Sequence, residues 1–130
     1  MAGTAAAQDA VARNGKHMPL DHAHLARYTL GDRALELEIL DLFLDQAPQT
    51  LDRLKGIAAT HPFDPKGWVA GCHTIKGSAR AVGAVDLATV SECGEAESDR
   101  TPERLEKHLV SITAALQDVT DYITAWRWQD

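Results

Sequence analysis

The sequence predicts an all-α protein, an antiparallel up-down four-helix bundle with a short additional N-terminal helix. Apolar residues recur at spacings of three and four along most of the chain, which is the period of one buried helical face. No stretch alternates strictly between apolar and polar residues as a strand would, and the chain has no Asn-Gly hairpin turn. Helices joined by short connections pack as antiparallel neighbours, and this favours the bundle.

Two domain-level expectations follow from composition. Residues 1 to 18 are rich in Ala and Gly and lack large apolar side chains, so we expect a flexible N-terminal tail, with residues 19 to 130 forming the bundle. Asp9 and Arg13 fall where a signal peptide would need an apolar block, so no secretory signal is expected.

The first two helices of the bundle domain are predicted from their N-terminal caps. Asp21 can cap a short helix that ends near Tyr28, and Asp32 can cap a second helix after the turn at residues 29 to 32. The second helix is expected from about residue 33 to 58 as one helix with a kink at Pro48. Its predicted buried face consists of Leu35, Ile39, Leu42, Phe43, Ala47, Leu51, Leu54 and Ala58.

The last three helices have equally clear boundaries. The third opens at Asp64-Pro65 and ends near Val82, where Gly83 can adopt the left-handed conformation of a C-cap. The fourth covers about residues 85 to 97 and is weakened by its internal glycine, and the fifth opens at Thr101-Pro102. The fifth carries a bundle seam of Leu105, Leu109, Ile112, Leu116, Val119, Ile123 and Trp126.

The third predicted helix has two distinct faces. Its buried stripe consists of Trp68, Cys72, Ile75, Ala79 and Val82, and its solvent face of His73, Lys76, Gly77 and Arg80. Glycine costs about 1 kcal/mol relative to alanine inside a helix. Its presence beside an exposed histidine therefore indicates that something approaches the backbone closely at Gly77.

These residues resemble the histidine-containing phosphotransfer family, whose motif is His-x-x-Lys-Gly-Ser/Ala followed about six residues later by Gly-Ala. The chain carries it as His73-Thr74-Ile75-Lys76-Gly77-Ser78-Ala79, then Gly83-Ala84, and the resemblance spans roughly residues 20 to 127. Two positions depart from the family pattern. Gly94 stands where a bulky apolar residue is usual, and Arg80 where a small or polar residue is frequent.

The resemblance implies a phosphorelay intermediate. His73 would accept a phosphoryl group and exchange it with aspartates of response-regulator receiver domains, with a hybrid histidine kinase upstream. Lys76 would stabilise the negative charge of the phosphoryl oxygens. The residues expected to contact the receiver are Gly77, Arg80, Val69, Ala70 and Thr74.

The same resemblance implies a stoichiometric phosphocarrier rather than an enzyme. The chain would need no cofactor of its own, because the Mg²⁺ would belong to the receiver domain. The sequence also has no Gly-rich phosphate loop, so we do not expect it to bind ATP.

Two alternative functions stay open. The chain could be the phosphoacceptor module of a chemotaxis-type histidine kinase, although its end at Asp130 favours a free-standing carrier. It could instead be a helical adaptor that binds receivers without being phosphorylated, although such an adaptor would not need to retain His73.

Composition narrows the range of partners and settings. The chain has 130 residues, 45% of them hydrophobic, and a net charge of −6, which argues against a nucleic-acid binder. No apolar run approaches the ~20 residues of a membrane span. Cys72 and Cys93 form no Cys-x-x-Cys pair, which favours a cytoplasmic setting and makes Cys72 a core residue.

The remaining histidines and the oligomeric state complete the expectations. His17, His61 and His108 lack matching ligand spacing, so we expect them on the surface and predict no metal site. A four-helix bundle closes its own core, and this favours a monomer.

Overall fold

The computed structural model describes residues 18–129. In that range it contains five helices and no strand, which confirms the all-α prediction. The helices are α2 (His22–Thr29), α3 (Arg33–Ala59), α4 (Pro65–Val82), α5 (Val85–Ala96) and α6 (Pro102–Arg127). Apart from Met18, the predicted tail lies outside the described residues.

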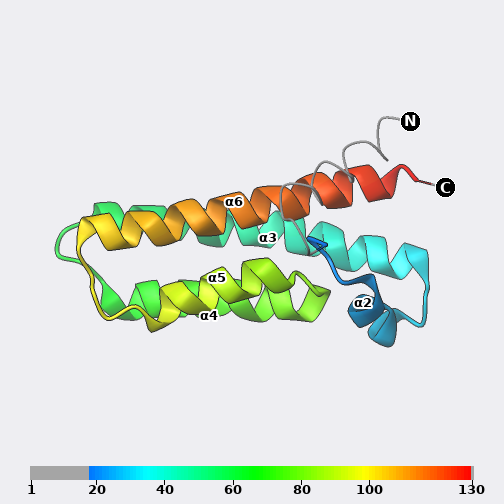
Figure 1. Ribbon diagram of the computed structural model, residues 1–130, viewed down its shortest axis with the longest axis horizontal. Helices are drawn as coiled ribbons and strands as arrows, with labels where there is room; N and C mark the ends of the chain where they lie inside the picture. Colours follow the sequence, from blue (N-terminus) through cyan, green and yellow to red (C-terminus); the bar gives the residue numbers. More distant parts are fainter. Residues whose placement is uncertain (1–17, 130) are drawn as a thin grey trace.

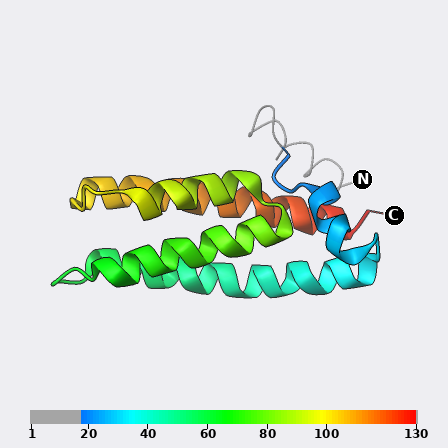
Figure 2. The same cartoon turned by 90° about the horizontal axis from the view of Figure 1, so that it is seen from below.

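Helices α3 to α6 form the expected up-down bundle. Consecutive helices run in opposite directions, and each helix contacts its two neighbours around a ring in which α6 closes back onto α3 (Figure 1). The view from below shows the same arrangement, with the α4–α5 hairpin covering the α3–α6 pair (Figure 2). The prediction of a four-helix bundle with one additional short helix is therefore confirmed.

Helix α2 lies beside the N-terminal part of α3, which extends beyond the α4–α5 hairpin (Figure 1). It contacts both α3 and α4. The backbone N–H of Asp21 donates to the carbonyl of Gly83 at 2.8 Å, which ties the start of α2 to the end of α4. Gly83 itself has a φ of 86°, so the predicted left-handed C-cap is confirmed.

The helices begin where the side-chain caps predict. Asp21, Asp32, Asp64 and Thr101 each accept a hydrogen bond from the backbone N–H three residues later. These bonds satisfy N–H groups that have no partner inside the helix. The predicted helix ends agree with the structure to within one residue. Helix α3 ends at Ala59 and α5 at Ala96, each one residue from its predicted end.

The predicted buried face of α3 is partly wrong. Leu35 and Leu42 are exposed, Leu42 by 57%, whereas Leu40 is fully buried. Helix α3 carries leucines or isoleucines on several of its sides, so spacings of three and four fit more than one face. The contacts with α4 and α6 select the face that includes Leu40, Phe43 and Leu54.

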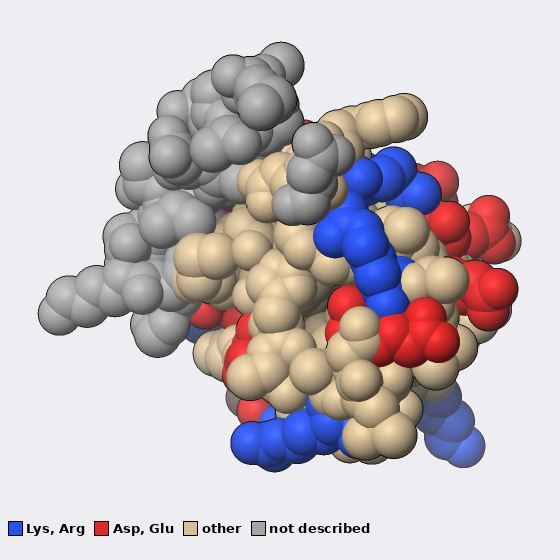
Figure 3. Space-filling view, turned by 90° about the vertical axis from the view of Figure 1, so that its right-hand side faces the viewer, with Lys and Arg blue, Asp and Glu red and all other residues tan. Residues whose placement is uncertain are grey.

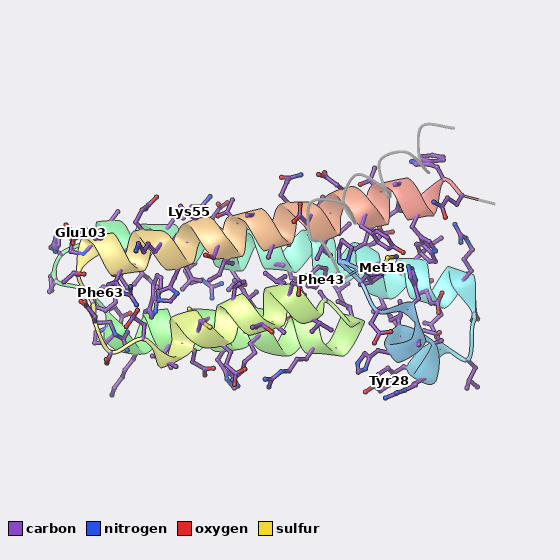
Figure 4. The ribbon with its side chains drawn as sticks, in the orientation of Figure 1. Met18, Tyr28, Phe43, Lys55, Phe63 and Glu103 are labelled. Atoms are coloured by element: carbon purple, nitrogen blue, oxygen red, sulfur yellow. The ribbon has the colours of Figure 1, made fainter. Side chains whose placement is uncertain are left out.

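Pro48 lies within α3, and the single helix expected across it is confirmed. The kink at this position stays a prediction. Phe43, five residues before Pro48, points into the space between the α3–α6 pair and the α4–α5 hairpin (Figure 4).

The end of the bundle nearest α2 is held together by charges. The Arg33 guanidinium donates to the carbonyls of Trp126, Arg127 and Gln129 at 3.0 to 3.1 Å and lies 4.4 Å from the centre of the Trp126 ring. It thereby caps the C-terminus of α6, where unpaired carbonyls carry partial negative charge. Arg127 forms an ion pair with Asp41 of α3. Figure 3 shows basic and acidic side chains next to one another on this end.

Candidate functional site

The site begins with the orientation of α4. Its predicted stripe is buried as expected, with Trp68, Cys72 and Ala79 at 0% exposure. Because these residues fix the rotation of the helix against the core, the residue after Cys72 must point outward. The His73 side chain is accordingly 66% exposed, in the middle of a helix held by caps at both ends.

Glu95 of α5 joins His73 to Lys76. One carboxylate oxygen lies 2.9 Å from Nδ1 of His73, and the other accepts a hydrogen bond from Nζ of Lys76 at 2.5 Å. A single carboxylate thus holds both the candidate phosphoacceptor and the candidate cation. It comes from the helix that packs against α4 around the ring.

Lys76 is therefore not on the solvent side of α4 as predicted. Its side chain is only 13% exposed, because its stem lies over the α4–α5 contact and its ammonium group is directed at Glu95. The prediction placed it by helical phase alone, which cannot show that a long side chain turns toward a neighbouring helix.

The electrostatics of the site determine which histidine nitrogen is free. The hydrogen bond from Lys76, and after it the one from His73, lower the pKa of Glu95 and keep it anionic, while partial burial acts in the opposite direction. An anionic carboxylate only accepts hydrogen bonds, so Nδ1 of His73 carries a proton and donates it. In the neutral ring, Nε2 then has the free lone pair, and this nitrogen faces away from Glu95.

Sequence reasoning missed Glu95. It lies 22 residues from His73, on a different helix. No motif within α4 indicates it. The available signal is positional, since α5 packs antiparallel to α4 after a tight turn and brings its last turn beside the middle of α4.

Gly94 explains how Glu95 comes so close. The indole N–H of Trp68 donates to the Gly94 carbonyl at 2.9 Å, and a Cβ on Gly94 would lie 3.2 Å from Sγ of Cys72. The glycine thus allows α5 to lie tightly against the buried stripe of α4. Close packing is therefore the consequence of this departure from the family pattern, and α5 continues beyond Gly94 to Ala96.

Gly77 has a different environment from Gly94. A Cβ at Gly77 would meet nothing within 4 Å, so packing within the described chain gives no reason for a glycine there. Ser78 and Ala79, which follow it, continue the helix without a break. The open surface beside His73 is the feature that the motif predicted.

Arg80 lies on the same side of α4 but is already paired. Its guanidinium donates to Glu92 of α5 at 3.1 Å, and both side chains are more than half exposed. This exposed ion pair contributes little to stability. It presents one positive and one negative group along the α4–α5 surface.

Two other predicted contact residues line a hollow beside His73. This hollow has a volume of about 420 Å³ and is lined by Pro65, Lys66, Val69, Ala70, His73 and Glu95. Val69 and Ala70 therefore lie beside His73, and their contact with a receiver stays a prediction. Thr74 is exposed outside this hollow, and its hydroxyl donates to the Ala70 carbonyl at 2.9 Å.

Lys66 was not predicted as part of the site. It lies seven residues before His73, which is two helical turns on the same face. The helical phase that grouped His73 with Gly77 and Arg80 could therefore have found it, had the phase been extended toward the N-terminus of the helix.

A family model for the Hpt domain matches residues 38–126. The chain belongs to the Hpt domain family. Comparisons with curated proteins and with solved structures gave no match. The matched range covers most of α3 and continues to the last turn of α6, so α2 precedes it. An Hpt domain functions in histidine phosphotransfer within a phosphorelay, alongside two-component signalling proteins.

One of the two cysteines of this Hpt domain, Cys72, fits a structural role, whereas Cys93 is exposed. Cys72 is fully buried, and burial raises the pKa of its thiol to about 12. A thiol in that state is a poor nucleophile. Within residues 18–129, no group of three His, Cys, Asp or Glu side chains could hold a metal ion. No helix of the same range is long and apolar enough to cross a membrane.

The histidines outside the site differ in their surroundings. His61 is exposed, as predicted. The prediction for His108 is wrong, because it is partly buried and its Nε2 lies 2.8 Å from Glu97. That contact joins the C-cap of α5 to α6, a pairing between consecutive helices that ligand spacing does not reveal. His17 lies outside the described residues.

Proposed function

We propose that His73 is the phosphoacceptor of this Hpt domain and exchanges its phosphoryl group with aspartates of response-regulator receiver domains. The observation that supports this most strongly is the pairing of His73 with Glu95 through Nδ1. In the neutral ring this pairing places the lone pair on Nε2, on an exposed side chain of a capped helix, as a nucleophile for phosphorus requires.

The transfer step follows from these groups. Nε2 attacks the phosphorus of an aspartyl phosphate, the bond between phosphorus and the aspartate oxygen breaks, and the leaving carboxylate keeps the electron pair. The imidazole ring becomes positively charged as the N–P bond forms. Glu95, hydrogen-bonded at Nδ1, stabilises that charge, and the reverse reaction regenerates the neutral ring.

Lys76 supplies the positive charge for the phosphoryl oxygens. It shares the Glu95 carboxylate with His73, so its ammonium group is near the ring before any phosphoryl group arrives. Negative charge develops on the oxygens during transfer, and a cation placed in advance stabilises it without reorganisation.

The receiver binds over the open surface around His73. Gly77 leaves room on one side, and the hollow beside Val69 and Ala70 lies on the other. The Arg80–Glu92 pair and Thr74 contribute polar groups at the edge. Both cysteines are free, which supports a location in the reducing cytoplasm together with the receivers and a hybrid kinase.

A phosphotransfer assay tests this function. The protein is mixed with receiver domains that carry labelled aspartyl phosphate, and we expect label on the protein that is labile in acid and stable in alkali. His73→Gln should abolish the label without lowering the melting temperature, because His73 lies off the core. His61→Gln, which changes an exposed loop histidine, is the matched control and should accept label normally. Label that persists on His73→Gln would contradict the assignment.

A second assay tests the docking surface. Gly77→Gln should keep the helix, since a Cβ there meets nothing within 4 Å, but its larger side chain should obstruct the receiver. We expect weaker receiver binding and slower transfer with an unchanged melting temperature. Equal affinity and equal rate would show that Gly77 is not a docking residue.

A further inference from the structure

The face of the bundle opposite the α4–α5 hairpin contains a groove. It lies between α3 and α6, has a volume of about 760 Å³, and presents mainly apolar surface. Its lining residues include Ala58 and Ala59 of α3, and Leu109, Val110 and Ala114 of α6. The small alanine side chains make it hollow, because they leave space between the two helix backbones.

The groove exposes a large apolar side chain. Val110 is 58% exposed, although it lines the groove and follows the buried Leu109 directly. An exposed valine next to an apolar hollow suits a surface that another molecule covers. The bundle needs neither Val110 nor the groove for its own core, because that core is already closed by buried residues of α3, α4, α5 and α6.

Charges of opposite sign stand on the two sides of this groove. Lys55 lines it from α3 and Glu106 from α6. Lys55 lies four residues before the end of α3, and Glu106 four residues after the start of α6, so the antiparallel helices place them at the same height along the bundle. Figure 4 shows Lys55 on the side of the bundle away from the α4–α5 hairpin.

Neither charge has an ion-pair partner among residues 18–129. This sets them apart from Lys76, Arg104 and Arg127, each of which is paired with a carboxylate. A basic α3 rim and an acidic α6 rim at equal height form a self-complementary pattern. A two-fold axis along the groove lays α3 of one copy over α6 of another, and each lysine then faces a glutamate.

We propose that a second copy of this chain binds in the α3–α6 groove, with Lys55 of each copy facing Glu106 of the other and Val110 of each copy inserted into the apolar surface. The interface leaves His73 free, because His73 and Glu95 lie on the α4–α5 side of the ring. The dimer thus presents two phosphotransfer sites on opposite outer faces. This departs from the monomer expected from the closed core.

Sedimentation equilibrium of the full chain over a wide concentration range tests the proposal first. We expect a reversible, concentration-dependent transition from the monomer mass to twice that mass. A single monomer mass at every concentration overturns the proposal. It does so even if a different protein occupies the groove, because the proposed occupant is a second copy of this chain.

Charge reversal tests the geometry. Lys55→Glu makes both rims acidic and Glu106→Lys makes both rims basic, so each variant should dimerise about tenfold more weakly or worse, because like charges then face each other. An equal mixture of the two variants should recover a heterodimer, since an acidic face then meets a basic one. A mixture that behaves as the sum of its separate components overturns the proposed orientation.

A matched pair of valine substitutions tests the location. Val110→Glu places a charge in the groove and should abolish the dimer. Val85→Glu changes a valine of similar exposure, 50% against 58%, at the start of α5 and outside the groove, and should leave the dimer unchanged. Both positions are on the surface, so both variants should melt near the unmodified chain. A dimer that survives Val110→Glu, or is lost equally in both variants, overturns the groove as its interface.

Discussion

At the scale of single residues, the site depends on one carboxylate serving two partners. Glu95 accepts hydrogen bonds from His73 and Lys76, and so fixes the ring and the cation together. The exposure of His73 could be predicted from sequence, because the phase of a helix follows from its buried stripe. The burial of Lys76 and the presence of Glu95 could not, because both depend on a contact between helices that are distant in the chain.

Lys76→Ala removes the cation and should slow phosphoryl transfer on the order of tenfold, about 1.4 kcal/mol of barrier. Receiver binding should change little, because the Lys76 ammonium group is directed at Glu95 and its side chain is mostly buried. Transfer reactions stopped at several time points give the rate. Lys107→Ala, at an exposed position of α6, is the control. An unchanged transfer rate would mean that Lys76 only holds Glu95 in place.

Glu95→Gln keeps a hydrogen-bond acceptor for Nδ1 of His73 but removes the negative charge. We expect transfer to slow by about tenfold, because the charged ring that forms during the reaction loses its stabilising carboxylate. Glu38→Gln on the exposed face of α3 should leave the rate unchanged. If both variants transfer at the original rate, the charge of Glu95 plays no part in the reaction.

At the scale of helices, caps and glycines determine how the elements begin, end and approach. The boundaries were predictable because a cap is a local arrangement of a side chain and nearby N–H groups. The buried face of α3 was predicted in part only. Its leucines surround the helix, and the choice of Leu40 over Leu42 depends on which neighbours pack against it.

Two of the three glycines of α4, Gly71 and Gly77, should respond oppositely to alanine. A Cβ at Gly71 would lie 2.6 Å from Leu54, so Gly71→Ala should push α4 from α3 and destabilise the fold by about 1–3 kcal/mol. Gly77→Ala meets no neighbour and should raise stability by up to about 1 kcal/mol. Urea unfolding of both variants measures the difference, and the same sign for both would show that α4 is not packed as described.

At the scale of the whole molecule, four helices in a ring place His73 on one face and the α3–α6 groove on the opposite face. The ring could be predicted from the short connections between amphipathic helices. The contacts that join its distant parts could not be, among them the bond of Glu97 to His108 and the capping of α6 by Arg33.

Stability should fall in acid through Glu97. Hydrogen bonds from His108, from the backbone N–H of Asp99 and from Arg104 lower the pKa of its carboxyl to about 2. An unfolded chain, with an ordinary glutamate pKa, binds this proton more readily, so the contribution is present in full above about pH 4.5 and is lost as pH falls toward 2. Urea unfolding between pH 7 and pH 3 should show a smaller loss of stability for Glu97→Gln than for the unmodified chain. An identical pH dependence would contradict this role.

The central claim is that Nε2 of His73 carries the phosphoryl group while Nδ1 stays hydrogen-bonded to Glu95. Nuclear magnetic resonance of the phosphorylated protein, with its histidine rings labelled with ¹⁵N, tests it most directly. The account predicts a phosphorus–nitrogen coupling at one ring only, that of His73, and at its Nε2. Coupling at Nδ1 of His73, or at the ring of any other histidine, would contradict it.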